Sequence, residues 1–218
     1  MHLAEEVTST QDVAASLFVG RPILVVAQRQ TAGRGRSGNV WATAPRALAA
    51  SLAVPASWPE EAWSLVPLVA GVAAARSIGG KCKLKWPNDL MIEEVKVGGL
   101  LAEASPDRFV IGCGINLYWP QPPEGVGSIY QQDPGAPAVE AIARAWADEL
   151  SSRLALGPSG WDSDDYRRLS DTLGRSVSWE PEGQGRAIDI ADDGSLIVRQ
   201  QDHLVRLSAG QIRHLRSG

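Results

Sequence analysis

The order of apolar and polar residues predicts a chain that alternates strands and helices over its first 172 residues. Apolar residues at helical spacing predict four helices, over 10–18, 64–77, 139–156 and 161–170. A β-branched run and several short apolar segments predict strands over 23–27, 47–54, 81–86, 90–93, 97–104 and 109–115. Thr10 and Ser64 are expected to cap the first two helices, because a hydroxyl can bond the free backbone N–H groups of a first turn.

The pattern changes after Leu173, where short alternating strands separated by glycine-containing turns replace the helices. Five strands are expected, near 176–180, 186–190, 195–200, 203–207 and 211–215. A β unit of this size is marginal by itself, so it is expected to pack on the rest of the chain. We therefore predict two domains, a larger one at 1–172 and a small β-barrel at 173–218.

Composition places the chain among ordinary globular proteins and excludes several classes. Of its 218 residues 44% are hydrophobic and 21% charged, which excludes a disordered tail, a collagen-like fibre and a heptad coiled coil. The formal net charge of −4 gives no overall field that would attract nucleic acid or anionic lipid. No signal-peptide pattern is present, and the most apolar window, 42–56, is too short and interrupted to span a bilayer.

The cysteines and histidines argue against a disulfide framework and a structural metal. Cys82 and Cys113 are too few for such a framework, which favours a reducing, cytoplasmic setting, although one pairing between them is left open. The three histidines have no metal-ligand spacing, and no Cys/His zinc pattern exists. We therefore expect no structural metal.

The segment GRGRSG at 33–38 is the sharpest chemical feature of the sequence. Its glycines let the backbone approach a ligand, and Arg34 and Arg36 offer planar, permanently charged groups suited to a carboxylate or phosphate. The segment matches neither a phosphate loop nor a dinucleotide fingerprint. A flexible surface loop with solvated arginines is the competing interpretation. The position between two buried strands favours a binding loop.

A second cluster reads KWPND and is followed by Lys96, which precedes a glycine pair. Asn88 and Asp89 can present a carbonyl and a carboxylate at the end of a strand, where magnesium or a ribose could bind. A plain Asx turn is the alternative explanation for Asp89. The Lys96 ammonium is expected to project into a cleft beside an anionic partner. An exposed hairpin lysine beside Glu93 and Glu94 is the competing reading.

Three weaker features complete the set. The strand GCGIN ends at Asn116, whose amide can donate and accept hydrogen bonds together, as an adenine edge requires. Glycines of this kind also serve packing alone. The hydroxyls of Ser9 and Thr10 are explained by a helix N-cap. Trp41 closes the arginine loop and can stack on a base.

Taken together and in this order, these motifs resemble those of the bacterial biotin protein ligases, also called biotin-[acetyl-CoA-carboxylase] ligases. The matched segments are STQ at 9–11, QTAGRGRSG at 30–38, KWPND at 85–89, KVGGLLAE at 96–103 and IGCGIN at 111–116. The resemblance covers nearly the whole chain and implies an α+β fold. That fold is a mixed, largely antiparallel sheet flanked by helices, related to the biotin/lipoate ligase domain, followed by a small SH3-like β-barrel.

The resemblance also implies a role for each matched residue. Biotin would be held by Ser9, Thr10, Gln30, Gly33, Arg34, Gly35, Arg36, Lys96, Gly98, Gly99 and Gly112. ATP would be held by Arg36, Trp41, Lys85, Asn88, Asp89, Lys96 and Asn116, with Mg²⁺ at Asp89. Lys96, Arg36 and Arg34 would act in catalysis. The sequence departs from the family pattern at Asn39, at Gln28 and at 48–50, which puts contacts from those positions in doubt.

The activity implied by the resemblance is ATP-dependent formation of biotinyl-5'-AMP, with release of pyrophosphate. The biotin would then pass to a lysine of the biotin carboxyl carrier protein of acetyl-CoA carboxylase. A lipoate-type acyl-adenylating ligase and a biotin-sensing regulatory protein are the alternatives. A DNA-reading helix-turn-helix module normally precedes the family's Ser-Thr motif, whereas eight residues precede Ser9 here, so no specific DNA binding is expected. A homodimer is left open.

Overall fold

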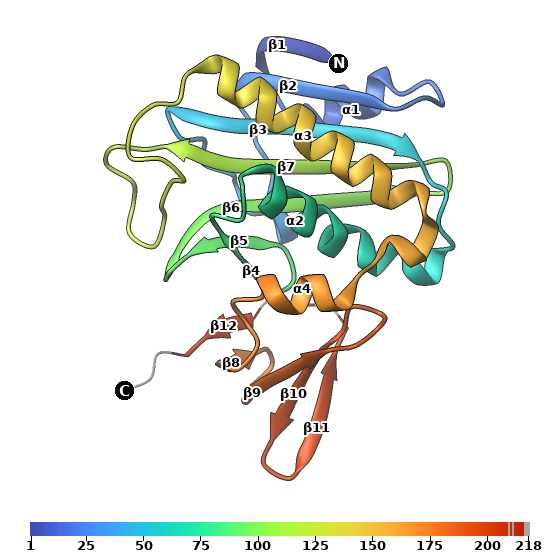
Figure 1. Ribbon diagram of the computed structural model, residues 1–218, viewed down its shortest axis with the longest axis vertical. Coiled ribbons are helices and arrows are strands. Elements are labelled where there is room, and N and C mark those ends of the chain that lie inside the picture. The colour runs from blue at the N-terminus through green and yellow to red at the C-terminus, as the bar shows by residue number, and fades with distance from the viewer. Residues whose placement is uncertain (209, 211, 216–218) are drawn as a thin grey trace.

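The computed structural model describes residues 1–208, 210 and 212–215, apart from the side chain of Ser37. Its larger part is a seven-stranded sheet with the order β1-β2-β3-β7-β6-β5-β4 (Figure 1). Only the β1–β2 pair is parallel, which confirms the expected mixed, largely antiparallel sheet. The strands are β1 (His2–Val7), β2 (Ile23–Gln30), β3 (Arg46–Pro55), β4 (Lys83–Lys85), β5 (Asp89–Ile92), β6 (Val95–Ser105) and β7 (Arg108–Tyr118).

Helices cover both faces of this sheet because its central strands are apolar on both sides (Figure 1). Residues 48, 50, 52 and 54 of β3 face a large core beneath α2 (Val66–Ser77) and α3 (Ala136–Ala155). On the other face Ala53, Val25 and Val110 pack against Ala14 of α1 (Thr10–Leu17). The face under α1 is therefore covered by a short helix along part of its width, and the rest is available to a site.

The predicted strands and helices are all present, but both expected helix caps were wrong. The N-cap of α1 is Ser9 rather than Thr10, and no side-chain cap hydrogen bond forms there. Before α2 the chain makes a 3₁₀ turn over Glu60–Leu65, and the Ser64 hydroxyl in it donates to the carbonyl of Asp193. Both hydroxyl residues are thus used in tertiary contacts instead of caps. Strand β1 was not expected, because most of its residues are exposed and too polar to form an apolar pattern.

The C-terminal part is a five-stranded antiparallel sheet with the order β11-β10-β9-β8-β12, in agreement with the expected small SH3-like β unit. Its strands are β8 (Ser176–Trp179), β9 (Gly183–Ile190), β10 (Leu196–Gln200), β11 (His203–Leu207) and β12 (Ile212–His214). Position 211 of the last predicted strand lies outside the described residues. Val177, Ile190 and Val198 belong to the same apolar core as the larger sheet. The predicted domain boundary at 172 therefore does not divide the core.

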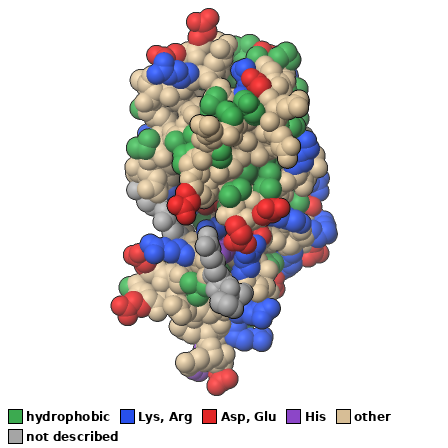
Figure 2. All heavy atoms as spheres, turned by 90° about the vertical axis from the view of Figure 1, so that its left-hand side faces the viewer, with side chains coloured by type: hydrophobic (Ala, Val, Ile, Leu, Met, Phe, Trp, Pro, Cys, Tyr) green, Lys and Arg blue, Asp and Glu red, His purple; other side chains and the backbone are tan. Residues whose placement is uncertain are grey.

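Polar contacts also join the two parts. The indole Nε1 of Trp86 donates to the carbonyl of Gly194 at 2.9 Å, and the backbone N–H of Asp171 donates to the carbonyl of Leu84 at 2.8 Å. Arg175 bonds Glu94 across the junction. Acidic and basic side chains gather at this level of the molecule (Figure 2). These contacts hold the second sheet against the β4–β5 end of the first.

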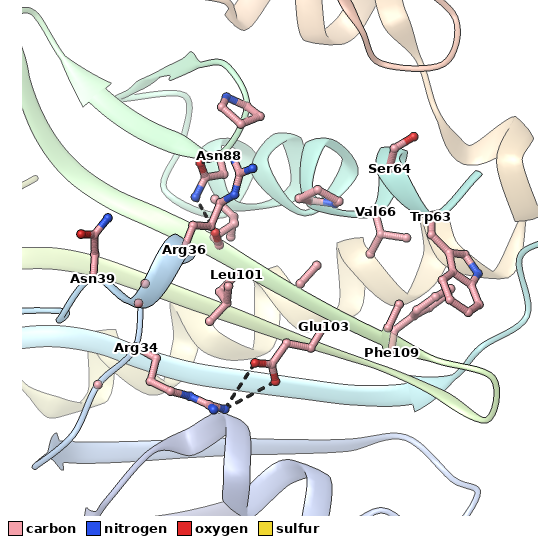
Figure 3. A pocket seen from close by; sticks show the side chains of 18 of the residues that line it. Arg34, Arg36, Asn39, Trp63, Ser64, Val66, Asn88, Leu101, Glu103 and Phe109 are labelled. Atoms are coloured by element: carbon pink, nitrogen blue, oxygen red, sulfur yellow. Dashed lines mark hydrogen bonds and ion pairs between the residues drawn. The ribbon is translucent and has the colours of Figure 1, made fainter. Parts of the chain in front are cut away.

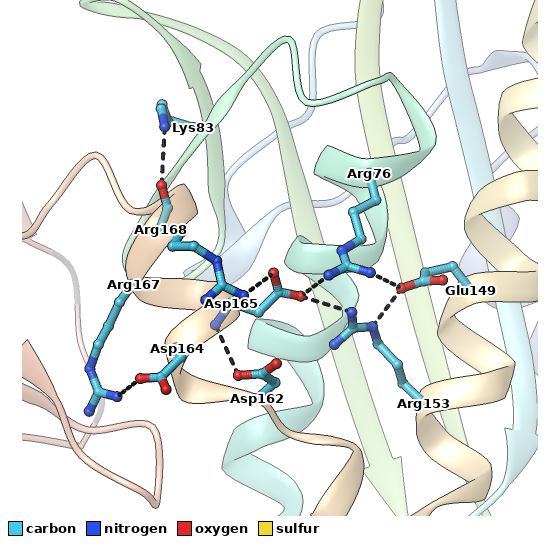
Figure 4. Close-up of polar contacts among 9 residues, drawn as sticks. All are labelled: Arg76, Lys83, Glu149, Arg153, Asp162, Asp164, Asp165, Arg167 and Arg168. Carbon is cyan, nitrogen blue, oxygen red and sulfur yellow. Dashed lines mark hydrogen bonds and ion pairs between the residues drawn. The ribbon is translucent and has the colours of Figure 1, made fainter.

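Helix α4 (Ser163–Leu169), which leads into the second sheet, is fixed by an ion-pair network (Figure 4). Buried Asp165 accepts hydrogen bonds from Arg76 of α2, Arg153 of α3 and Arg168 of its own helix. Burial alone would raise the pKa of Asp165, but the bonds from Arg76 and Arg153 hold it below its usual value. Removing a partner of a buried charge leaves that charge uncompensated, so the network ties α4 to both long helices.

The two cysteines lie in the apolar core. Cys82 and Cys113 are free and buried, so the pairing that was left open does not form. Burial raises the pKa of the Cys82 thiol to about 12, which keeps this thiol protonated and unreactive. No helix within the described residues is long and apolar enough to cross a membrane.

Candidate functional site

The predicted site residues surround a cavity of about 360 Å³ between α1, the arginine loop and the α1-facing side of the large sheet. All but three of the predicted residues line it. Those that do are Ser9, Thr10, Gln30, Arg34, Gly35, Arg36, Trp41, Lys85, Asn88, Asp89, Lys96, Gly99 and Gly112. They come from strands, a helix and loops that are far apart in sequence, so the fold brings the motifs together.

The floor of the cavity is backbone. Gly112 and Gly114 of β7 lie side by side with small residues of β3 and with Gly99 of β6, because the register pairs Gly114 with both Ala49 and Gly99. A Cβ at Gly112 would come within 3.0 Å of the Gln11 side-chain oxygen. A Cβ at Gly114 would come within 2.8 Å of two ring carbons of Trp41. Only glycine therefore allows these side chains to lie so close to the sheet.

One end of the cavity is neutral and rich in hydrogen-bonding groups. The backbone N–H and the hydroxyl of Thr10 both donate to Gln30 Oε1, at 2.8 and 3.1 Å, and the Thr10 hydroxyl also bonds Ser51 at 2.8 Å. Since Gln30 Oε1 already accepts two hydrogen bonds, Gln30 can offer a ligand only its N–H₂ group. The Ser9 hydroxyl is buried without a partner, so a helix cap does not explain it.

The other end is cationic. Lys96 Nζ lies 2.5 Å from Asp89 Oδ1 and 6.0 Å from the centre of the Trp41 ring, so Lys96 is not a hairpin lysine paired with Glu93 or Glu94. The β4–β5 pairing places Lys85 opposite Asp89. Asp89 is the one acidic residue among the described lining residues, against Lys85, Lys96, Arg34, Arg36 and Arg213. A cavity with this excess of positive charge suits an anionic ligand.

The two arginines of the loop point in opposite directions (Figure 3). Arg36 donates to Asn88 Oδ1 at 3.3 Å and to the carbonyl of Gly210 at 3.4 Å. Arg34 instead bonds Asp12 at 2.8 Å and reaches Glu103 at 3.4 Å. Both guanidinium groups have protein partners, although Arg34 is also exposed, so the contacts of Arg36 favour the binding-loop interpretation over a flexible loop. In this conformation the exposed Arg34 guanidinium is paired with acidic side chains of the protein.

Three predicted residues lie outside the cavity lining. Gly33 lines a neighbouring groove of about 950 Å³, which Figure 3 depicts. Gly98 is packed so tightly that a Cβ would come within 2.7 Å of the Gly114 carbonyl. Asn116 is buried and donates to the carbonyl of Gly127 at 3.1 Å, while the N–H of Gly127 donates to the carbonyl of Lys96 at 2.9 Å. Asn116 thereby holds Gly127, which in turn bonds the backbone of Lys96.

Several buried polar atoms at or beside this site have no hydrogen-bond partner. Among the described residues, buried side-chain atoms without a hydrogen-bond partner include Ser9 Oγ, Gln11 Oε1, Trp41 Nε1 and Asn116 Oδ1. Burying such an atom without a partner is unfavourable, and most buried polar groups in proteins are paired. Three of these four residues line the cavity. Their presence indicates a ligand that carries both donors and acceptors.

Several lining residues were not predicted as site residues. Gln11 and Gly114 lie inside the motifs at 9–11 and 111–116. The amide of Gln11, next to the site residues Ser9 and Thr10, is the sequence signal that could have identified Gln11. Ser51 follows from the strand pairing with Gly112, which a single sequence does not reveal. Arg213 comes from β12 of the second sheet. No local pattern around Arg213 signals this, because it reaches the cavity only through packing of the two sheets.

The model of the biotin/lipoate A/B protein ligase family matches residues 3–116. The chain is 35% identical over 214 residues to the biotin–[acetyl-CoA-carboxylase] ligase of Mycobacterium tuberculosis, covering 89% of this chain and 79% of that protein. It is 28% identical over 233 residues to the bifunctional ligase/repressor BirA of Bacillus spizizenii, covering 94% and 71%.

Solved structures agree with this match. The biotin protein ligase of Aquifex aeolicus in complex with biotin and ATP superposes with a TM-score of 0.83 at 25% identity, covering 99% of this chain and 98% of that one. The biotin protein ligase of Leishmania major in complex with biotin gives a TM-score of 0.66 at 26% identity, covering 100% and 98%. The similarity therefore extends over both sheets.

Proposed function

Because the chain belongs to the biotin/lipoate A/B protein ligase family, we propose that it is an ATP-dependent biotin protein ligase. It activates biotin as biotinyl-5'-AMP with release of pyrophosphate, then transfers biotin to a lysine of the biotin carboxyl carrier protein of acetyl-CoA carboxylase. The observation that carries this proposal is the cavity itself, in which a neutral hydrogen-bonding end adjoins a cationic end over a floor of glycine backbone. Biotin has the matching halves, a neutral cyclic urea and a carboxylate.

Biotin would enter with its urea at the neutral end. Ser9, Thr10 and Gln30 would bond this group. The Gln30 N–H₂ suits the urea carbonyl because Gln30 Oε1 already accepts two hydrogen bonds from Thr10. The backbone at Gly99 and Gly112 would lie along the thiophane ring and the acyl chain. Gly33, Gly35 and Gly98 shape the loop and the strand that bound this slot.

Adenylation is then mainly an electrostatic problem. A carboxylate oxygen must bond to the α-phosphorus while the bond from that phosphorus to the leaving pyrophosphate breaks, so two anions have to meet. Lys96 would lie between them, with Arg36 beside it, and both charges are already fixed by protein partners. Trp41, Lys85 and Asn88 would contact the nucleotide, and Asn116 would act indirectly, through the segment that packs behind Lys96. Fixed groups of this kind align the reactants as well as stabilise charge.

Magnesium fits the site only as an ion held largely by the nucleotide. No group of three His, Cys, Asp or Glu in the described part of the chain could hold a metal. Asp89 offers one carboxylate, with one oxygen on Lys96. Mg²⁺ in nucleotide sites commonly uses one or two carboxylates together with phosphates and water. Asp89 would therefore help to hold a Mg²⁺ that neutralises phosphate charge when it is bound.

In the second step a lysine amine of the carrier attacks the carbonyl of the adenylate. The C–N bond forms, the bond to AMP breaks, and the amine loses its proton to solvent. Between the two steps the arginine loop would shield the bound adenylate from water. The loop is held in place by the bond of Arg34 to Asp12 and the bond of Arg36 to Asn88. Two free, buried cysteines are compatible with a cytoplasmic setting, which we also propose.

Pyrophosphate release tests the activity directly. With Mg²⁺ and ATP, biotin is expected to stimulate release, and a purified carrier domain is expected to gain one biotin on a lysine, detected by mass spectrometry. Lipoate and octanoate serve as competing acids. Release with lipoate but not with biotin would replace the proposal by a lipoate-type ligase. Tight biotin binding without release would favour a regulatory protein.

A further inference from the structure

We propose that Gln11 is a specificity-determining residue whose Oε1 accepts a hydrogen bond from a ring N–H of the substrate's cyclic urea. This inference rests on the proposed function and goes further by assigning a partner to the donor side of the urea. Gln11 lies at the start of α1, is 4% exposed and lines the cavity. It was absent from the residues predicted to bind substrate.

The orientation of the Gln11 amide is fixed by its surroundings. Its Nε2 has three acceptors within reach, the carbonyls of Val110 at 3.3 Å and Leu101 at 3.4 Å and a carboxylate oxygen of Glu103 at 3.4 Å. A flipped amide would turn its oxygen toward these three oxygens and lose every bond. The N–H₂ group therefore faces the sheet edge, and Oε1 faces the other way.

On that other side Oε1 lies over Gly112 at the floor of the cavity, 3.0 Å from where a Cβ at Gly112 would be. It is shielded from solvent and accepts no hydrogen bond from any residue in the described part of the chain. An unpaired buried acceptor costs free energy that a ligand donor can recover. Because Gly112 has no Cβ, no side chain of that residue separates Oε1 from the backbone floor of the cavity.

At the neutral end, the Ser9 hydroxyl and Gln11 Oε1 are described side-chain oxygens without a hydrogen-bond partner, and of the two Gln11 Oε1 can act only as an acceptor. Gln30 Oε1 is already occupied by two bonds from Thr10, and the Thr10 hydroxyl is engaged with Ser51. A cyclic urea presents one carbonyl and two N–H donors, so it needs acceptors as well as the Gln30 donor. A dithiolane or a plain acyl chain has no such donor. Gln11 therefore favours a urea over other acyl substrates of similar length.

Glu103 positions this acceptor. The Glu103 carboxylate accepts from Gln11 Nε2 and also bonds Arg34 of the loop, so one side chain connects the cavity wall with the loop above it (Figure 3). The contact of Arg34 with Glu103 therefore helps to hold the Gln11 amide in the orientation that turns Oε1 toward the cavity floor. Glu103 lies near the C-terminal end of β6, and Lys96 lies near the other end of the same strand.

The test uses desthiobiotin and its two oxazolidinone analogues, in each of which one ring N–H is replaced by oxygen. Calorimetry on the full-length wild-type chain is expected to give about 10-fold weaker binding for the analogue that lacks the N–H facing Gln11. Gln11→Met, similar in size but without an acceptor oxygen, is expected to weaken desthiobiotin by a similar factor and to abolish the difference for that analogue. Ser16→Ala, an exposed change on the same helix, is the matched control.

Each outcome has a distinct meaning. If both analogues bind the wild-type chain as tightly as desthiobiotin, the proposal is overturned without reference to any variant. Equal weakening of all three ligands by Gln11→Met would assign Gln11 a purely structural role and also overturn it. Failure of the wild-type chain to bind biotin or desthiobiotin at all is a different result, which contradicts the proposed function. Thermal unfolding of each variant establishes that the compared proteins are folded.

Discussion

Lys96 of β6 reaches diagonally to Asp89 of the neighbouring strand β5, with 2.5 Å between Nζ and Oδ1. Asp89 gives the Lys96 ammonium a partner at the mouth of the cavity while no phosphate is present. A substrate carboxylate and an α-phosphate would compete for the same charge. The pair therefore keeps the ammonium in position before the anions meet.

Lys96→Ala is expected to lower the rate of adenylation by about 10²- to 10³-fold, because a fixed charge matters most when two anions are forced together. Biotin affinity, measured separately by calorimetry, should fall much less. Lys85→Ala should mainly raise the KM for ATP, since Lys85 would meet only outer phosphates. Steady-state pyrophosphate release on both variants separates the two effects.

Lys83→Ala is a suitable control for both lysine variants, because Lys83 is exposed, does not line the cavity and donates to the carbonyl of Arg168. Near-normal turnover of Lys96→Ala would remove Lys96 from the centre of the mechanism.

Arg36→Gly should loosen the adenylate without abolishing its formation. The substitution removes a charge-assisted donor and the contacts to Asn88 and Gly210 that hold the loop over the cavity. A bond of this kind is worth about 1.5 to 3 kcal/mol, or roughly 10- to 150-fold in dissociation. Stopped-flow measurement of adenylate release tests this, and unspecific labelling of lysines should rise with it. An unchanged release rate would make Arg36 a surface arginine.

Arg213→Ala should raise the KM for ATP by about 3- to 10-fold, with little change for biotin. Arg213 brings a positive charge from β12 to the cationic end, but it is exposed, so solvent and salt reduce its effect. The loss should shrink at high ionic strength. Arg206→Ala, which changes an exposed arginine of the same sheet, is the control. Identical ATP kinetics for both variants would exclude Arg213 from the nucleotide site.

Stability should fall as the pH drops from about 6.5 toward 4, because of His214. Burial, with Lys85 nearby, lowers the pKa of His214 to about 4, although Asp171 opposes the shift. Arg175 and Glu94 also face this histidine, with smaller and opposite effects. Neutral His214 therefore stabilises the fold above the unfolded-state value of 6.5, and this contribution disappears as the pH falls through 4. The change is about 3 kcal/mol in the free energy of unfolding.

Chemical denaturation of the wild-type chain and of His214→Gln between about pH 3 and 7 measures this contribution. The variant should lose the slope between pH 4 and 6.5, whereas the loss below pH 4, where Asp165 takes up a proton, should stay. Parallel profiles for the two proteins over the whole range would contradict the assignment to His214.

The sequence predicts those parts of the fold and the site that rest on local pattern. Apolar periodicity locates the predicted strands and helices. The glycine-rich motifs lie together because one follows β2 and the other two belong to the neighbouring strands β6 and β7. Lys96 is an example, since a lysine directly before a buried glycine strand must emerge at the strand end. Thr10 lies at the site for the same local reason, although its partner Gln30 is a tertiary one.

Features that depend on long-range packing escape such reasoning. Strand β1 has no apolar alternation because it is an exposed edge. Ser64 has the residue type of a cap but bonds Asp193, which lies 129 positions away. Arg213 reaches the cavity only because the second sheet packs beside the first. Arg34 has the chemistry of a substrate ligand, yet the nearness of Asp12 and Glu103, which the sequence does not reveal, determines where it points.

The glycine floor limits how this protein could be redesigned. A cavity lined by side chains can be enlarged by trimming them, but backbone at Gly112 and Gly114 has nothing left to remove. Every substitution there subtracts volume, so from this side the range of accepted acids can only become narrower. Variants that accept bulkier acids must therefore come from the residues above the floor, Gln11 and Trp41 among them, and mutant libraries are best directed to that side.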